Sequence, residues 1–66
     1  MKAQIKEVWY NAIAGAFEGR VDIARDAGTF RYPCVVEGPA NMPRQMVRRQ
    51  MVAQARQMSD SRGARF

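Results

Sequence analysis

Arginine side chains are the groups in this 66-residue sequence whose type and spacing could do chemistry, and they gather toward its end. The charges of residues 1–40 cancel, whereas residues 41–66 hold six arginines and one aspartate, so the net charge of +5 belongs to the second segment. These arginines are Arg44, Arg48, Arg49, Arg56, Arg62 and Arg65. A guanidinium group is a planar fork of donors that suits carboxylates and phosphates. The charge therefore predicts an acidic protein surface or a nucleic acid as partner, and in the second case Gln45 and Gln57 could contact base edges.

Four of the five methionines fall in the same stretch of sequence. Met51 and Met58 are spaced to share an inward-facing stripe of a helix with Val47. Met42 and Met46 lie off this stripe, and methionine is common on surfaces that accept varied partners. We therefore expect Met42 and Met46 to contribute to partner binding together with the arginines.

Catalytic and metal-binding groups are scarce. The sequence contains no histidine and one cysteine, Cys34, which excludes serine–histidine and cysteine–histidine catalysis, intrachain disulfides and ordinary zinc sites. Asp22 and Asp26 lie near Glu18, but so short a chain has little volume for the pocket that general acid–base catalysis requires. No phosphate-binding glycine loop or metal-ligand spacing is present. We expect a non-enzymatic protein with no catalytic residue, no metal and no cofactor.

A helix predicted over residues 42–58 must position the arginines and methionines. Its apolar residues recur at three- and four-residue steps, and no acidic residue interrupts it. Asn41 is a suitable N-cap, and Pro43 is tolerated in a first helical turn. Residues 59–66 are expected to form a flexible basic tail.

A β-hairpin is predicted over residues 20–36. Val21 and Ile23 alternate with polar residues, and Gly28 can adopt the positive φ that closes the turn after them. Pro33 has no amide hydrogen, which places part of the second strand at an edge. One face of this second strand is expected to be buried. That face consists of Phe30, Tyr32, Cys34 and Val36.

Residues 2–17 admit two interpretations. Apolar residues recur at three- and four-residue steps from Ile5 to Phe17, and Gly19 can end a helix, so a helix is favoured. The alternative is a further strand, followed by a turn at Glu18 and Gly19, which would complete a three-stranded meander.

The element order is α-β-β-α in the favoured interpretation and β-β-β-α in the other. Both belong to the α+β class, with a small antiparallel sheet covered by a helix, in a single domain over residues 1–58. A single cysteine is typical of a reducing cytoplasm, and no apolar run is long enough to span a membrane. Self-association would enlarge so small a core. We expect a basic binding or adaptor protein that docks its last helix on an acidic macromolecule, or a nucleic-acid-binding protein that uses the same arginines for phosphate contacts.

Overall fold

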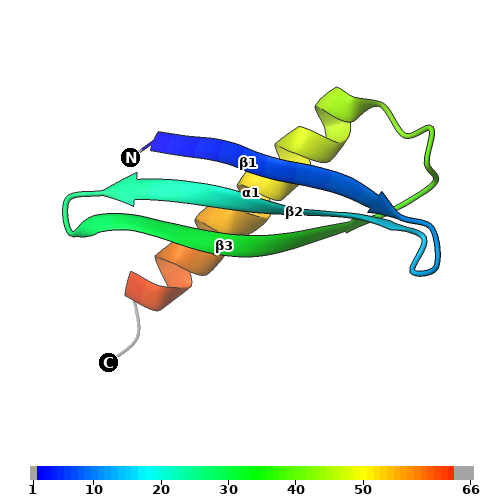
Figure 1. Ribbon diagram of the computed structural model, residues 1–66. Coiled ribbons are helices and arrows are strands. Elements are labelled where there is room, and N and C mark those ends of the chain that lie inside the picture. Colours follow the sequence, from blue (N-terminus) through cyan, green and yellow to red (C-terminus); the bar gives the residue numbers. More distant parts are fainter. Residues whose placement is uncertain (1, 64–66) are drawn as a thin grey trace.

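Three consecutive strands form an antiparallel sheet, and one helix lies across one face of it, in this computed structural model (Figure 1). In chain order the elements are β1 (Lys2–Asn11), β2 (Ala16–Arg25), β3 (Gly28–Glu37) and α1 (Arg44–Gly63). β2 is the central strand, so β1 and β3 are the two edges. The structure describes the backbone of residues 2–63 and the side chains of residues 2–61. The expected α+β class, a small antiparallel sheet packed by a C-terminal helix, is confirmed.

The first segment is a strand, so the favoured prediction of a helix over residues 2–17 is wrong. The alternative interpretation as a further strand holds, and the element order is β-β-β-α. The turn predicted at residues 18–19 is also wrong, because these residues lie within β2 and the chain reverses at residues 12–15 instead.

Asn11 and Gly15 make this reversal. The side-chain Oδ1 of Asn11 accepts the backbone N–H groups of Ile13 and Ala14 at 3.1 and 3.2 Å. Gly15 adopts a φ of 65°, a conformation that glycine reaches without steric cost. These local bonds favour a turn where helical spacing alone predicts a continuous helix.

β1 pairs with β2 in a register that shifts once, between Ile5 and Glu7. Ala3 and Ile5 pack against the core before this β-bulge, and Val8 and Tyr10 do so after it. A bulge inserts one extra residue into a strand, so the alternation of inward and outward side chains changes phase. β1 thereby keeps apolar side chains over the helix on both sides of the bulge.

The second hairpin agrees with the prediction for residues 20–36, although both strands are longer than predicted. Gly28 opens β3 with a φ of 136°, and Pro33 lies on an edge strand. The predicted inner face is buried or partly buried at each of its positions: Phe30, Tyr32, Cys34 and Val36.

α1 is the predicted C-terminal helix, but its start differs from the prediction. It begins at Arg44, and the carbonyl of Pro43 accepts the backbone N–H groups of Met46 and Val47 at 3.0 and 3.2 Å. Pro43 therefore takes the N-cap position, and the predicted N-cap at Asn41 is wrong.

The helix also continues to Gly63, past residue 58, into the segment that was predicted to be a basic tail. Ser59 is only 3% exposed, and its Oγ lies 2.5 Å from the donor Nε of Arg25. Arg25 also pairs with Asp60 at 2.8 Å. These bonds tie the late turns of α1 to the end of β2.

A stripe of buried side chains joins the helix to the sheet, and its members are Val47, Met51, Ala55 and Ser59, with Met58 partly buried beside them. Gly19 lies beneath Met51 in the middle of β2. A Cβ atom at Gly19 would collide with the backbone oxygen of Glu7 and lie 3.0 Å from the Met51 sulfur. Glycine at position 19 therefore leaves room for the backbone of β1 on one side and for the Met51 side chain of α1 above it.

We expect Gly19→Ala to lower the free energy of unfolding by about 1–3 kcal/mol, because the added methyl group overpacks this contact against a backbone atom. Urea denaturation measures the change. Ala24→Val is the matched control, since Ala24 is partly exposed on the other face of the same strand. If Gly19→Ala unfolds with the same free energy as the wild type, the space around Gly19 accommodates a methyl group and the prediction is contradicted.

Candidate functional site

Two adjoining hollows lie where β1 meets α1, and they bring the predicted arginines together. The first is lined by side chains that include Ala3, Gln4, Ile5, Arg48, Arg49 and Arg56. The second lies toward the other end of β1 and is lined by side chains that include Val8, Tyr10, Arg44 and Arg48. Because Arg48 lines both hollows, they form one continuous surface, which we call the β1 groove.

The direction of α1 explains this arrangement. The helix crosses the sheet obliquely, so its first turns emerge beyond β1 and its last turns emerge beyond β3 (Figure 1). The N-terminal half of α1 therefore lies next to the outer edge of β1. Four of the six arginines predicted to bind a partner are exposed along this edge: Arg44, Arg48, Arg49 and Arg56.

Acidic neighbours divide the arginines into two sets. Among the residues whose side chains are described, three arginines make ion pairs: Arg20 with Glu7, Arg25 with Asp60 and Arg31 with Asp22. In the same part of the chain, the four arginines of the β1 groove have no acidic partner. The β1 groove thus carries positive charge that only solvent or an external anion can compensate.

The other predicted site residues do not line the β1 groove. Met42 is partly buried and packs against the core, with its methyl group next to Gly38. Met46 is 46% exposed but lines neither hollow. Only the backbone of Arg62 is described, in the last turn of α1, and Arg65 lies outside the described residues.

The two glutamines predicted to contact bases are also separated. Gln45 lines the β1 groove, whereas Gln57 lines a different hollow between α1 and β3. These glutamines therefore do not act on one surface.

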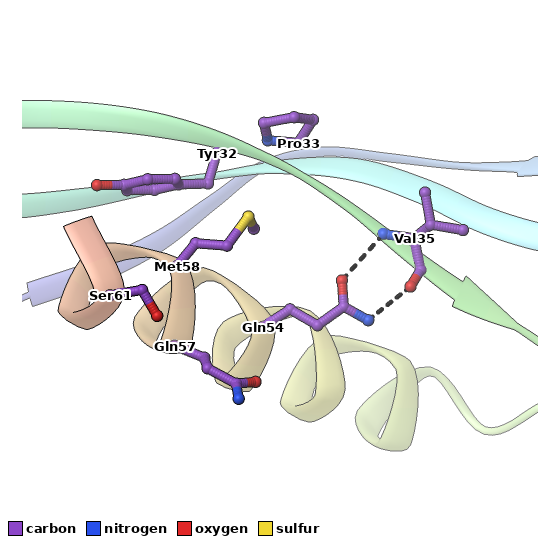
Figure 2. A pocket seen from close by; sticks show the side chains of 7 residues that line it. All are labelled: Tyr32, Pro33, Val35, Gln54, Gln57, Met58 and Ser61. Carbon is purple, nitrogen blue, oxygen red and sulfur yellow. Dashed lines mark hydrogen bonds between the residues drawn. The ribbon is translucent and has the colours of Figure 1, made fainter. Parts of the chain in front are cut away.

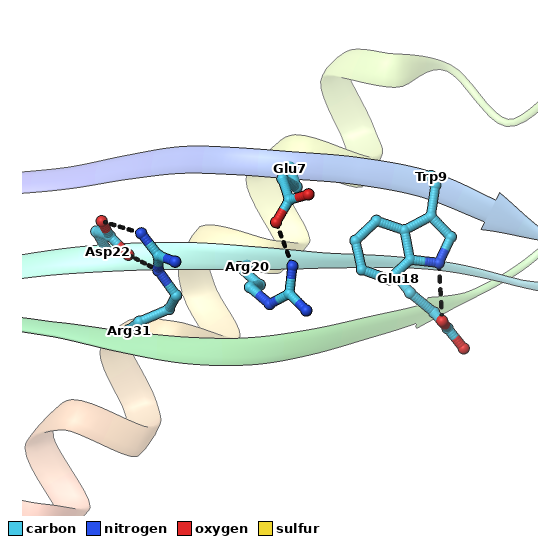
Figure 3. Close-up of polar contacts among 6 residues, drawn as sticks. All are labelled: Glu7, Trp9, Glu18, Arg20, Asp22 and Arg31. Carbon is cyan, nitrogen blue, oxygen red and sulfur yellow. Dashed lines mark hydrogen bonds and ion pairs between the residues drawn. The ribbon is translucent and has the colours of Figure 1, made fainter.

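The face of the sheet away from the helix carries charges that compensate one another (Figure 3). Arg20 pairs with Glu7, and its guanidinium lies 5.5 Å from the centroid of the Trp9 ring. The indole Nε1 of Trp9 donates a hydrogen bond to Glu18 at 2.9 Å. The arginine of this group is therefore compensated by a carboxylate of the same face.

Asp22 and Arg31 form the second pair on this face, with donor–acceptor distances of 2.9 and 3.4 Å. The hydrogen bond from Arg31 holds the pKa of Asp22 below its usual range; the charges of Arg31 and Lys6 act in the same direction, and partial desolvation opposes them. The same hydrogen bond raises the pKa of Arg31. Asp22 is thus a stable carboxylate and a poor general acid.

Gln54 closes the β3 edge of the sheet (Figure 2). Its side-chain amide accepts the N–H of Val35 at 3.1 Å and donates to the carbonyl of Val35 at 2.5 Å, as a neighbouring strand would. Pro33 has no N–H to offer on the same strand. The hollow beside this contact is lined by uncharged residues: Tyr32, Pro33, Val35, Gln54, Gln57, Met58 and Ser61. Sequence reasoning missed this edge contact.

Cys34 is buried, and its thiol lies 3.4 Å from the carbonyl oxygen of Met51. Burial raises the pKa of the Cys34 thiol, which disfavours the nucleophilic thiolate. Among the described residues, no cluster of three or more acidic or cysteine side chains could hold a metal ion. In the same part of the chain, no helix combines the length and the apolar character needed to cross a membrane.

No protein-family model matches the chain, and neither a curated protein nor a solved structure matches it. The chain's own residues define a β-β-β-α protein with an arginine-lined groove along one edge of its sheet.

We expect Gln54→Ala to speed hydrogen exchange at the Val35 amide and to lower the free energy of unfolding by about 1 kcal/mol, because two hydrogen bonds to Val35 are lost. Exchange followed by NMR measures the first effect. Gln57→Ala is the control, since Gln57 lines the same hollow without bonding to β3. Unchanged exchange at Val35 would contradict the role of Gln54.

The lowered pKa of Asp22 predicts a loss of stability in acid. The folded protein holds this proton more weakly than the unfolded chain, so the contribution is complete above the unfolded pKa and is lost as the pH falls through the folded pKa, below about pH 4. Thermal unfolding as a function of pH should show a smaller acid dependence in Asp22→Asn than in the wild type. Asp26→Asn is the control, because Asp26 makes no ion pair among the described residues. An identical acid dependence in Asp22→Asn and the wild type would contradict the prediction.

Proposed function

We propose that this protein is a non-enzymatic binding protein that docks the arginines of the β1 groove on an acidic macromolecular partner. One observation carries the proposal: the arginines elsewhere among the described side chains are paired with carboxylates, and those of the β1 groove are not. Arg44 and Arg48 are four residues apart on α1, a spacing at which like charges destabilise a helix. An anionic partner would relieve this repulsion.

The mixed chemistry of the β1 groove favours a protein as that partner. Ile5 and Val52 contribute apolar surface beside the arginines, and Gln45 contributes an amide. An acidic protein segment can pair its carboxylates with guanidinium forks and cover the apolar surface at the same time. Direct binding of DNA or RNA through phosphate contacts to the same arginines is the alternative, and the placement of Gln45 and Gln57 in different hollows weakens it.

The non-enzymatic part of the proposal is supported by the state of the groups that could react. The thiol of Cys34 is buried, and the carboxylates of Asp22 and Glu18 are held by hydrogen bonds. The single cysteine supports a reducing cytoplasm as the place of action.

We expect the double substitution Arg48→Gln and Arg49→Gln to weaken the binding of a fluorescent oligoglutamate peptide by about tenfold or more, because two charge-assisted contacts are lost. Fluorescence anisotropy at about 50 and 200 mM salt measures the affinity, which should fall with salt. The matched control is Arg20→Gln with Arg31→Gln, which removes the same charge from the opposite face of the sheet.

Three results would contradict the proposal. Equal loss in both double variants would mean that net charge alone attracts the peptide. Tighter binding of an oligothymidine strand, lost with Arg48 and Arg49, would assign the groove to nucleic acid. Failure of both probes to bind would remove the β1 groove as an anion-binding surface.

A further inference from the structure

Along the outer edge of β1, no described residue pairs with the backbone of the strand. The side chain of Gln54 bonds to both the backbone N–H and the carbonyl of Val35, so these two groups point away from β2. Glu18 lies opposite Val35 on β2 and cannot bond to it, so the N–H and carbonyl of Glu18 point toward β1. Trp9, the partner of Glu18 on β1, therefore points its backbone groups inward. Along a strand, the backbone N–H and carbonyl groups of successive residues point alternately to one edge and to the other. With the extra residue of the bulge taken into account, four residues of β1 point these groups away from β2: Ala3, Ile5, Val8 and Tyr10.

The two edges of the sheet therefore differ. β3 is blocked by Pro33 and by the side chain of Gln54. Among the described residues, no side chain or loop bonds to the outward groups of β1, which is ten residues long and contains no proline. An open edge of this length is a template for another strand, and natural proteins usually block such edges.

We propose that an extended acidic segment of a partner protein adds to β1 as a fourth strand, with its carboxylates against the arginines of α1. This inference rests on the proposed function and states how the partner binds. Backbone hydrogen bonds to β1 would supply affinity, and the alternation of side chains would supply specificity.

The position of α1 supports this mode of binding. Because its first turns emerge beyond β1, a fourth strand would lie over the helix as the other three strands do (Figure 1). Every second side chain of that strand would point toward Arg48, Arg49 and Val52. The partner segment should therefore carry acidic residues at alternate positions.

Charge argues against a second copy of this chain as the occupant. Pairing of β1 with β1 would bring two sets of groove arginines to one junction. β1 itself contributes Lys2 and Lys6 against Glu7 alone. Like charges that meet across an interface are unfavourable, so an acidic strand fits this edge better than β1 does.

The test uses the full chain and labelled peptides of alternating threonine and glutamate. One peptide is unmodified, a second carries backbone N-methyl groups at its glutamates, and a third carries them at its threonines. All have the same charge. In a strand, alternate N–H groups face the neighbour, so one methylated peptide should lose about tenfold or more in affinity while the other keeps it. Hydrogen exchange at Ala3, Ile5, Val8 and Tyr10 should slow when the unmodified peptide binds.

A protein variant provides an independent check. Ala3→Pro removes one outward N–H, as Pro33 does on the opposite edge, and should weaken the unmodified peptide by about 2- to 12-fold. Thr29→Pro is the control, because alternation from Val35 places the N–H of Thr29 on the outer edge of β3, away from the β1 groove.

Each other outcome overturns strand addition in a different way. If both methylated peptides bind like the unmodified one and binding still requires Arg48 and Arg49, the proposed function stands and the strand does not form. If no peptide binds, both proposals fail, and arginine-dependent binding of oligothymidine would then identify a nucleic-acid site. If sedimentation shows that the free protein dimerises and Ala3→Pro abolishes the dimer, the edge belongs to a second copy.

Discussion

The close approach of α1 to β2 at Gly19 is the contact on which the rest of the arrangement depends. Met51 lies directly over this glycine, and the Cys34 thiol beside it reaches the Met51 carbonyl, so small residues on two strands make room for one large side chain. With its middle fixed there, an oblique helix must extend beyond the sheet at both ends (Figure 1). Arg44, Arg48 and Arg49 of the first turns line the β1 groove, whereas Ser59 and Asp60 of the late turns bind Arg25. The position of α1 over the sheet thus pairs Arg25 with Asp60 and leaves the arginines of the β1 groove without an acidic partner among the described residues.

The same geometry makes the two edges of the sheet unequal. At β3, the helix passes close enough for the Gln54 amide to replace a neighbouring strand, and Pro33 removes a further donor. At β1, α1 contributes long cationic side chains that carry no hydrogen-bond acceptor and so cannot satisfy backbone N–H groups. On the exposed face of the sheet, Arg20 and Arg31 are paired with carboxylates of the same face. Unsatisfied charge and unsatisfied backbone therefore occur together in one place, along β1.

Sequence reasoning recovered the elements with regular patterns and missed the one with a broken pattern. The second hairpin and the C-terminal helix follow from alternation, turn residues and helical spacing. β1 did not, because its bulge separates Ile5 from Val8 by three residues, which imitates the spacing of a helix. The arginines of the site were predictable from charge. The strand edge that they border was not part of the favoured prediction, because that prediction assigned residues 2–17 to a helix. Gln54 gave no signal, since its partner Val35 lies 19 residues away and contacts it only through the tertiary fold.

The small size of the chain suggests that the open edge of β1 also affects folding stability. A chain of 66 residues buries a modest fraction of its surface, and β1 is the strand whose apolar side chains remain only partly buried. A fourth strand would cover Ala3 and Ile5 from the side and Val52 from above, so a bound partner would enlarge the core as well as compensate the arginines. A ligand that binds only the folded state stabilises it by an amount that grows with the logarithm of the ligand concentration divided by its Kd. In this protein the proposed binding surface coincides with the least complete part of the core, and partner binding and folding stability would therefore be linked through β1.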